Sequence, residues 1–157
     1  SFDDPEDPVS MEEVVTATGA TPVAWRRRLD CCGGAFSVAR TGSVVRLSRA
    51  ILDDARSAGA DAIAVACPMC HSNLDFRQKA LVRRGEAELP VLYLSELVGL
   101  ALGLDAGSLG LGRHFVETKG FVERALAPKP AAKPPAGAAK PATPKPAAEA
   151  TAGKETV

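Results

Sequence analysis

The cysteines are the residues of this chain that are best suited to chemistry, and all four fall into two tight pairs. Cys31 and Cys32 are neighbours followed by two glycines, whereas Cys67 and Cys70 form a CxxC motif. A CxxC motif at the start of a helix turns both sulfurs to one side, where the helix dipole favours the thiolate form. Thiolates are the species that bind metals and attack disulfides, so the spacing predicts a metal or redox site.

The adjacent cysteines, Cys31 and Cys32, favour one kind of metal or redox site over the others. A disulfide between neighbouring residues is strained, and two adjacent side chains rarely reach one tetrahedral zinc ion together. Neighbouring thiolates can bind different irons of a multi-iron cluster, and Gly33 would let the backbone turn sharply beside such a bulky group. We therefore expect an iron–sulfur cluster. The alternatives are a four-cysteine zinc site, thiol–disulfide exchange at Cys67 and Cys70 alone, and buried, inert cysteines.

Apolar patterning and turn residues predict the elements that position these pairs. In chain order, the sequence favours a helix from a Ser10–Glu13 capping box to Gly19, a strand at Pro22–Trp25, an amphipathic helix over Val44–Ala55 that ends at Gly59, a strand at Ala62–Ala66, a helix from Pro68 to about Gly85, a strand at Pro90–Leu94, a helix capped by Ser95 and ending near Gly103, and a last short helix from His114.

This alternation is typical of an α/β fold built of βα repeats: a small parallel sheet with helices on its faces and right-handed crossovers. The carboxyl ends of parallel strands share one edge of the sheet, where cofactor chemistry gathers. The first predicted strand leads to Cys31 and the second leads to Cys67. We therefore expect both cysteine pairs to meet at the carboxyl ends of the strands.

Other polar residues near the motifs have ordinary structural interpretations. His71 follows Cys70 and could be a ligand or a proton donor, but a surface or capping role is expected in the first turn of a helix. His114 lies far from the cysteines in the sequence, which favours a structural role. Arg26–Arg28 are expected to form a solvated face that could also attract an anionic substrate.

Composition divides the chain into a folded unit, residues 1–126, and a tail, residues 127–157. The tail is almost wholly Ala, Pro, Lys, Gly and Thr, so we expect a disordered tether. The folded unit has a net charge of −3 and no basic face for nucleic acid. Neither a signal peptide nor a membrane span is evident, which favours a cytoplasmic protein without direct membrane insertion.

The segments LDCCGG and VACPMCHSNLDFRQ, with LSELVGLALGLD, closely resemble the cysteine-rich CCG domain of the heterodisulfide reductase B-subunit family, in its second, carboxyl-terminal repeat. The resemblance implies an enzyme, an oxidoreductase acting on sulfur groups. It also implies a noncubane four-iron four-sulfur cluster bound by Cys31, Cys32, Cys67, Cys70 and one upstream cysteine. Electrons would come from a C-subunit-like iron–sulfur protein and an A-subunit-like flavoprotein.

Two departures from the family pattern qualify this prediction. None of the 30 residues before Cys31 is a cysteine, and the first CCG repeat does not precede it. We therefore expect an amino-terminally incomplete repeat, either a fragment or a split subunit, that is an incomplete catalyst alone. The alternatives are a non-catalytic zinc- or cluster-binding docking module, or the iron–sulfur subunit of a lactate, glycolate or glycerol 3-phosphate oxidation system.

Overall fold

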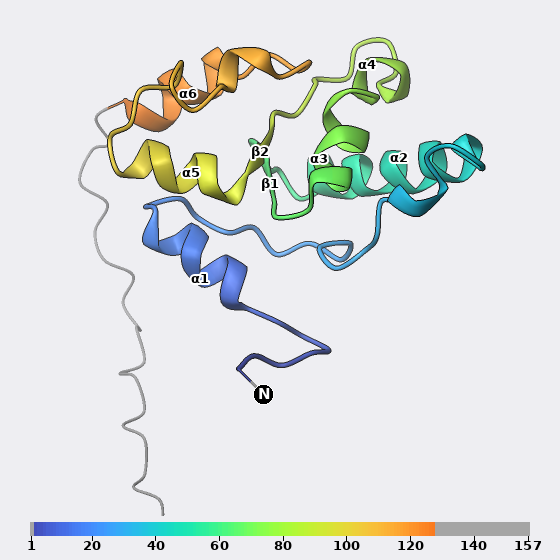
Figure 1. Ribbon diagram of the computed structural model, residues 1–157, viewed down its shortest axis with the longest axis horizontal. Coiled ribbons are helices and arrows are strands. Elements are labelled where there is room, and N and C mark those ends of the chain that lie inside the picture. Colours follow the sequence, from blue (N-terminus) through green and yellow to red (C-terminus); the bar gives the residue numbers. More distant parts are fainter. Residues whose placement is uncertain (1, 128–157) are drawn as a thin grey trace, which may run out of the picture. The chain divides into compact units, whose positions relative to one another are not determined.

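A computed structural model describes residues 2–127, so the predicted tail lies outside the described residues from position 128 onward (Figure 1). The described part alternates helices with two short strands. Its elements are α1 (Ser10–Ala17), η1 (Gly34–Phe36), α2 (Thr41–Ser57), β1 (Ile63–Val65), α3 (Pro68–Asp75), α4 (Gln78–Leu81), β2 (Val91–Tyr93), α5 (Leu94–Ala101), η2 (Leu111–Arg113) and α6 (Lys119–Leu126), where η denotes a 3₁₀ helix.

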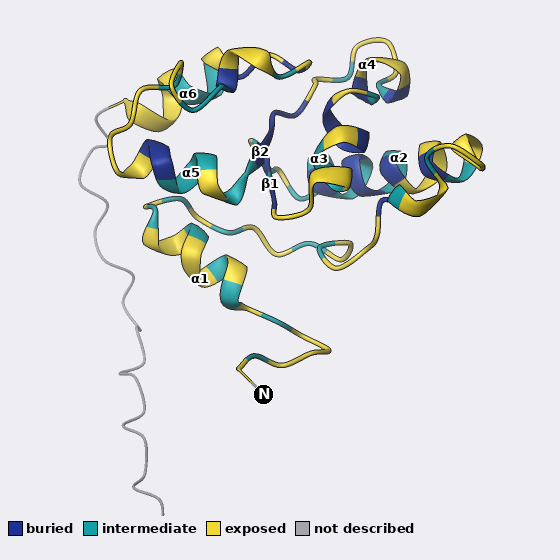
Figure 2. Ribbon diagram, viewed as in Figure 1, coloured by how far each residue is buried: buried dark blue, intermediate teal, exposed yellow. Residues whose placement is uncertain are grey.

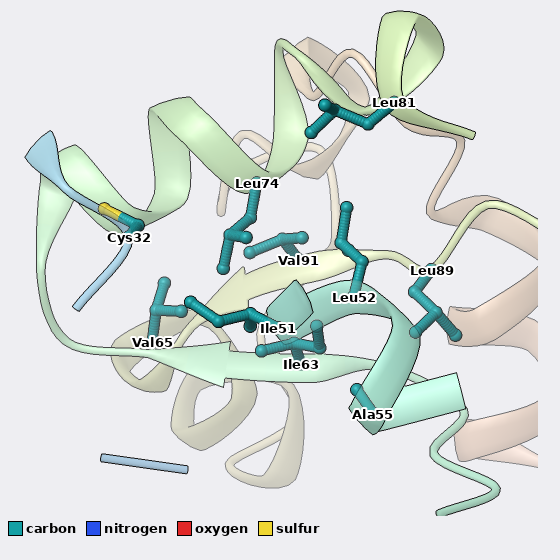
Figure 3. Packing of buried hydrophobic residues seen from close by; sticks show 10 residues of the cluster. All are labelled: Cys32, Ile51, Leu52, Ala55, Ile63, Val65, Leu74, Leu81, Leu89 and Val91. Atoms are coloured by element: carbon teal, nitrogen blue, oxygen red, sulfur yellow. The ribbon is translucent and has the colours of Figure 1, made fainter. Parts of the chain in front are cut away.

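The two strands form a parallel sheet in which Ile63 pairs with Val91. Successive strand residues face opposite sides of the sheet, so Val91 and Leu92 enter different apolar clusters. On one side the cluster includes Ile63, Val91 and Leu52 of α2 (Figure 3). On the other side, Leu92 belongs to a cluster with Leu100 of α5. The buried residues gather on the two strands and on the adjoining parts of α2 and α3 (Figure 2). The predicted α/β fold, with helices on the faces of a small parallel sheet, is confirmed.

The predicted strand at Pro22–Trp25 is wrong, because this segment forms no ladder with β1 among the described residues. Pro22 has no N–H group to donate to a strand neighbour. The backbone that follows is instead held by a side chain: the Asp54 carboxylate of α2 accepts the N–H groups of Arg26 at 2.9 Å and Arg27 at 3.0 Å. The first cysteine pair therefore follows a loop and not a strand.

Acidic side chains, and not the predicted serines, cap two of the helices. Ser10 lies inside α1, where its N–H donates to the Asp3 carboxylate at 2.9 Å. Ser95 lies inside α5, and the Glu96 carboxylate accepts the N–H of Tyr93 at 2.8 Å. A carboxylate at a helix N-terminus satisfies free N–H groups and also suits the helix dipole. These two serine predictions were therefore wrong.

Other helix ends match the sequence pattern in part. Gly19 and Gly59 adopt φ of 84° and 77° two residues after the last residues of α1 and α2, as the predicted stop positions require. Pro68 is the first residue of α3, as predicted, but the helix expected to reach Gly85 is split into α3 and α4. His114 lies between η2 and α6, so the last helix begins later than predicted.

Candidate cysteine site

The CxxC pair lies at the junction between β1 and α3, as predicted. Cys67 is the N-cap residue of α3, with extended φ and ψ of −96° and 124°, and its side chain is exposed. The backbone N–H groups of Cys70 and then Met69, in the first turn of α3, lower the pKa of the Cys67 thiol. Cys67 is therefore the sulfur of this pair that loses its proton more readily.

Cys70 has the opposite character although it is only three residues away. It is partly buried, and burial, followed by the Cys32 sulfur beside it, raises the pKa of its thiol to about 12. The Cys67 sulfur also lies against it and adds to this effect. The Cys70 sulfur thus lies beside both the Cys32 sulfur and the Cys67 sulfur, and these three neighbouring sulfurs are called a series below.

The first pair splits between the core and the surface. Cys32 is 1% exposed and lies at one end of the apolar cluster between the sheet and α2 and α3 (Figure 3). The side-chain amide of Asn73 on α3 donates to the Cys32 sulfur at 3.4 Å. Cys31 is exposed, and its sulfur accepts the N–H of Gly33 at 3.3 Å. All four cysteines are free thiols.

The glycines after the first pair let this loop approach two helices. Gly33 has φ of 79°, and a Cβ placed on it would lie 2.8 Å from Cδ1 of Leu47 on α2. A Cβ on Gly34 would lie 2.8 Å from the Cβ of Met69 on α3. The backbone at these glycines therefore passes close to side chains of α2 and α3. The expected role of Gly33 beside a cofactor stays a prediction.

Side chains from α1 and α2 hold the loop before the first pair. The Arg28 guanidinium donates to the Pro8 carbonyl at 2.6 Å and to the Glu12 carboxylate at 2.8 Å. Burial opposes ionisation of Asp54, but the N–H groups of Arg27 and Arg26 outweigh it and lower the pKa of this carboxyl group. Asp54 therefore stays charged near neutral pH and keeps its hold on the loop.

The donor set fits a metal centre with soft ligands. Four free thiols belong to one loop and one strand-to-helix turn, and three of them lie in series. Thiolates select zinc, copper(I) or iron–sulfur clusters, and a bound cation removes the proton that burial otherwise keeps on a thiol. Four cysteines are therefore present at the positions for which the family resemblance implies four of five ligands.

A second cluster of polar side chains lies at the same edge of the sheet. The His71 ring stacks on Tyr93 with centroids 4.3 Å apart and meets the His114 ring edge-on at 4.7 Å. His114 Nε2 lies 3.0 Å from Glu96 Oε1. Burial, followed by repulsion from His114, lowers the pKa of His71. The expected surface or capping role of His71 is therefore wrong, because its ring is packed between two others.

Comparison with known proteins matches residues 2–75 to the family model of the cysteine-rich domain named CCG. The chain is also 36% identical over 126 residues to the B subunit of ferredoxin:CoB-CoM heterodisulfide reductase from Methanosarcina mazei, covering 77% of this chain and 42% of that protein. It is 34% identical over 118 residues to the 8-methylmenaquinol:fumarate reductase membrane anchor subunit of Wolinella succinogenes, covering 74% of this chain and 42% of the relative.

The chain thus spans about two fifths of the length of these relatives. Of the helices in residues 2–127, none combines the length and the apolar character that crossing a bilayer requires. The matched residues contain both cysteine pairs, and the likeness to heterodisulfide reductase B subunits extends over about three quarters of the chain. The chain belongs to the family of cysteine-rich CCG-domain proteins that includes the B subunits of heterodisulfide reductases.

Proposed function

We propose that this chain is the iron–sulfur-binding part of the catalytic subunit of a heterodisulfide reductase-like complex. Cys31, Cys32, Cys67 and Cys70 would bind a noncubane four-iron four-sulfur cluster, and the fifth thiolate would come from another segment or chain. When bound, the cluster supplies single electrons and a metal surface for a substrate sulfur. Zinc is the alternative metal at this site.

The observation that supports this proposal best is the series formed by the Cys32, Cys70 and Cys67 sulfurs. These residues come from two motifs separated by 34 positions, yet they meet beside the carboxyl end of β1. A chance set of buried, inert cysteines would have no reason to gather there. The identity to the B-subunit relatives then favours iron–sulfur chemistry over a structural zinc site.

The protein side chains around the sulfurs have separate tasks in this proposal. Cys32 is buried and held by Asn73, so it would anchor the cluster to the core. Cys31 and Cys67 are exposed, so they would lie on the side that a substrate or an electron donor can reach. The N–H groups of the first turn of α3, which favour the Cys67 thiolate, would also offset part of the negative charge of a cluster.

We place this chain in a larger assembly in the cytoplasm. Its partners would be a C-subunit-like iron–sulfur protein, an A-subunit-like flavoprotein and the first CCG repeat, which together supply electrons and complete the site. Residues 1–126 would then be the second CCG domain and residues 127–157 a tether. This assignment draws on the B-subunit relatives, of which the chain spans about two fifths.

Anaerobic reconstitution of the full chain with iron and sulfide, with zinc as competitor, tests the proposal. We expect iron and acid-labile sulfide in equal amounts, and a charge-transfer spectrum lost in Cys70→Ser. Tight zinc binding without iron uptake would contradict the cluster assignment. In an assembled complex, Cys31→Ser should abolish disulfide reduction, whereas a docking module would lose stability without losing turnover.

The fumarate reductase relative favours a second candidate function. The same cluster site could transfer electrons in an oxidation system whose substrate contains no sulfur, such as one for lactate, glycolate or glycerol 3-phosphate. Addition of a disulfide to the reduced, reconstituted chain separates the two. Reoxidation of the cluster by the disulfide supports a reductase, and an unchanged spectrum supports electron transfer alone.

A further inference from the structure

His71, Glu96 and His114 lie between the two strand-to-helix turns of the sheet. His71 follows β1 on α3, Glu96 follows β2 on α5, and His114 lies in the segment after η2. One ligand atom from each residue, a ring nitrogen or a carboxylate oxygen, lies within 4.8 Å of those of the other two. Three donors from three separate elements therefore converge on one point.

The spacing is close to that of a coordination shell. Zinc–nitrogen and zinc–oxygen bonds of about 2.0–2.2 Å in a tetrahedral arrangement place neighbouring ligand atoms about 3.3 Å apart. His114 Nε2 and Glu96 Oε1 are already 3.0 Å apart. Small side-chain rotations would bring the third donor, from His71, to the same separation.

Two of the imidazole nitrogens at this point are buried without a partner. His71 Nε2 and His114 Nδ1 form no hydrogen bond to any described residue, and the His114 side chain is only 5% exposed. A buried polar atom without a partner costs about 1–3 kcal/mol, so most such atoms in proteins are satisfied. A cation bound by His71 Nε2 and by His114 Nε2, the nitrogen that faces Glu96, would provide the partner that His71 Nε2 lacks.

The surrounding contacts orient the donors as metal sites require. Ligating histidines usually donate their second nitrogen to a carboxylate or a carbonyl, and the other side of the His71 ring lies beside the Val91 carbonyl. Glu96 is held by the N–H of Tyr93 at 2.8 Å.

The segment that carries His114 is fixed to the helix that carries His71. The buried Asp75 carboxylate of α3 accepts the N–H groups of Phe115 at 2.8 Å and Val116 at 2.9 Å. These two bonds hold the backbone next to His114 against α3. The segments that carry the three donors are therefore held together before any ion arrives.

We propose that His71, Glu96 and His114 form a second metal site, which binds a divalent cation of the zinc type through two imidazoles and one carboxylate. Two histidines and a glutamate are a known zinc ligand set with a water molecule in the fourth position. The ion would join α3, which carries the Cys67–Cys70 pair, to α5 and the segment after η2. The site is independent of the function proposed for the cysteines.

The composition of the chain makes a direct test possible. The sequence contains two histidines, and both belong to this site, so the imidazole NMR spectrum of the full chain reports on it alone. Zinc ions would be titrated into the reduced chain while the reactivity of the cysteines towards a thiol reagent is followed in parallel. We expect both imidazoles to shift together at one stoichiometry, in a step separate from thiol protection.

Glu96→Gln is the informative variant, because its amide oxygen can still accept the Tyr93 N–H and keep α5 capped. We expect it to weaken the histidine step about tenfold or more and leave thiol protection unchanged. Glu123→Gln is the matched control, since this carboxylate is 66% exposed and far along the chain on α6. An unshifted His114, a His71 shift that only follows thiol protection, or equal affinity in Glu96→Gln would overturn the proposal.

Discussion

The Cys67–Cys70 pair is held by secondary structure, whereas side chains from other elements hold the Cys31–Cys32 pair. Cys67 lies two residues after β1 and is the N-cap residue of α3, so the strand, Pro68 and the helix determine where its sulfur lies. The loop before Cys31 has no strand, and depends on Asp54 and on the close approach of Gly33 to α2. One site can thus combine two kinds of support. The Cys67–Cys70 pair is the rigid half, fixed by its own strand and helix, whereas the Cys31–Cys32 pair is the half that side chains of other elements hold in place.

The largest expected effect is a loss of folding stability that disturbs both cysteine pairs together. Leu52 is fully buried in the cluster that also contains Cys32 and lies against the sheet. Leu52→Ala should lower the free energy of unfolding by about 2–5 kcal/mol, because it leaves a cavity under both halves. Chemical denaturation checks the loss, with Leu102→Ala, at a residue that is 76% exposed, as the control. A small effect would mean that the pairs do not share one core.

A smaller change should disturb the first pair alone. Gly33→Ala places a Cβ 2.8 Å from Leu47 at a φ of 79°, which should cost about 1–3 kcal/mol. Cys32 should then react faster with a thiol reagent while Cys67 keeps its wild-type rate, as mass spectrometry of labelled peptides can show. Gly42→Ala is the matched control, since a Cβ there has no neighbour within 4 Å. Equal changes at both cysteines would contradict the division into two halves.

Acid should loosen the first pair before the second. The folded state lowers the pKa of Asp54 below its ordinary value of 3.8, so the stabilisation that Asp54 provides is complete above that value. This stabilisation is lost as the pH falls through the lower, folded-state pKa. The protection of the Arg26 and Arg27 amides from hydrogen exchange, relative to their intrinsic rates at each pH, should therefore fall below about pH 4, and Asp54→Asn should show reduced protection already at pH 7. Protection factors that change neither with pH nor with this substitution would remove Asp54 from the account.

The smallest effect concerns the ion pair on the same carboxylate. The Arg26 guanidinium lies 3.2 Å from Asp54, but its side chain is 93% exposed and screened by water. Arg26→Ala retains the backbone N–H that Asp54 holds, so its stability and Cys32 reactivity should equal those of the wild type. A marked loss in thermal denaturation would show that the side chain, and not the backbone, anchors the loop.

The sequence predicted the rigid half of the site better than the other half. The apolar run before Cys67 and the proline after it are local signals, and both describe β1 and α3 correctly. The segment before Cys31 was predicted as a strand and is a loop, because the distant carboxylate of Asp54 holds its backbone N–H groups. Side-chain contacts across 28 residues leave no periodic pattern in a sequence.

The histidine cluster escaped prediction for the same reason. His71 and His114 are far apart in the sequence, and their pattern is that of surface or structural residues. The Asp75 carboxylate, which binds the backbone beside His114, brings them together. The available signal was the shared edge of the sheet, since His71 and Glu96 both follow predicted strands.

The central claim is that the two cysteine pairs form one cluster site. Native mass spectrometry after anaerobic reconstitution tests it on the wild type and on two double variants, Cys31→Ser with Cys32→Ser and Cys67→Ser with Cys70→Ser. The account predicts one iron–sulfur cluster in the wild type and none in either double variant, because each pair alone supplies only two of the five proposed ligands. A double variant that retains the cluster, or that binds its own metal with undiminished affinity, would contradict the account.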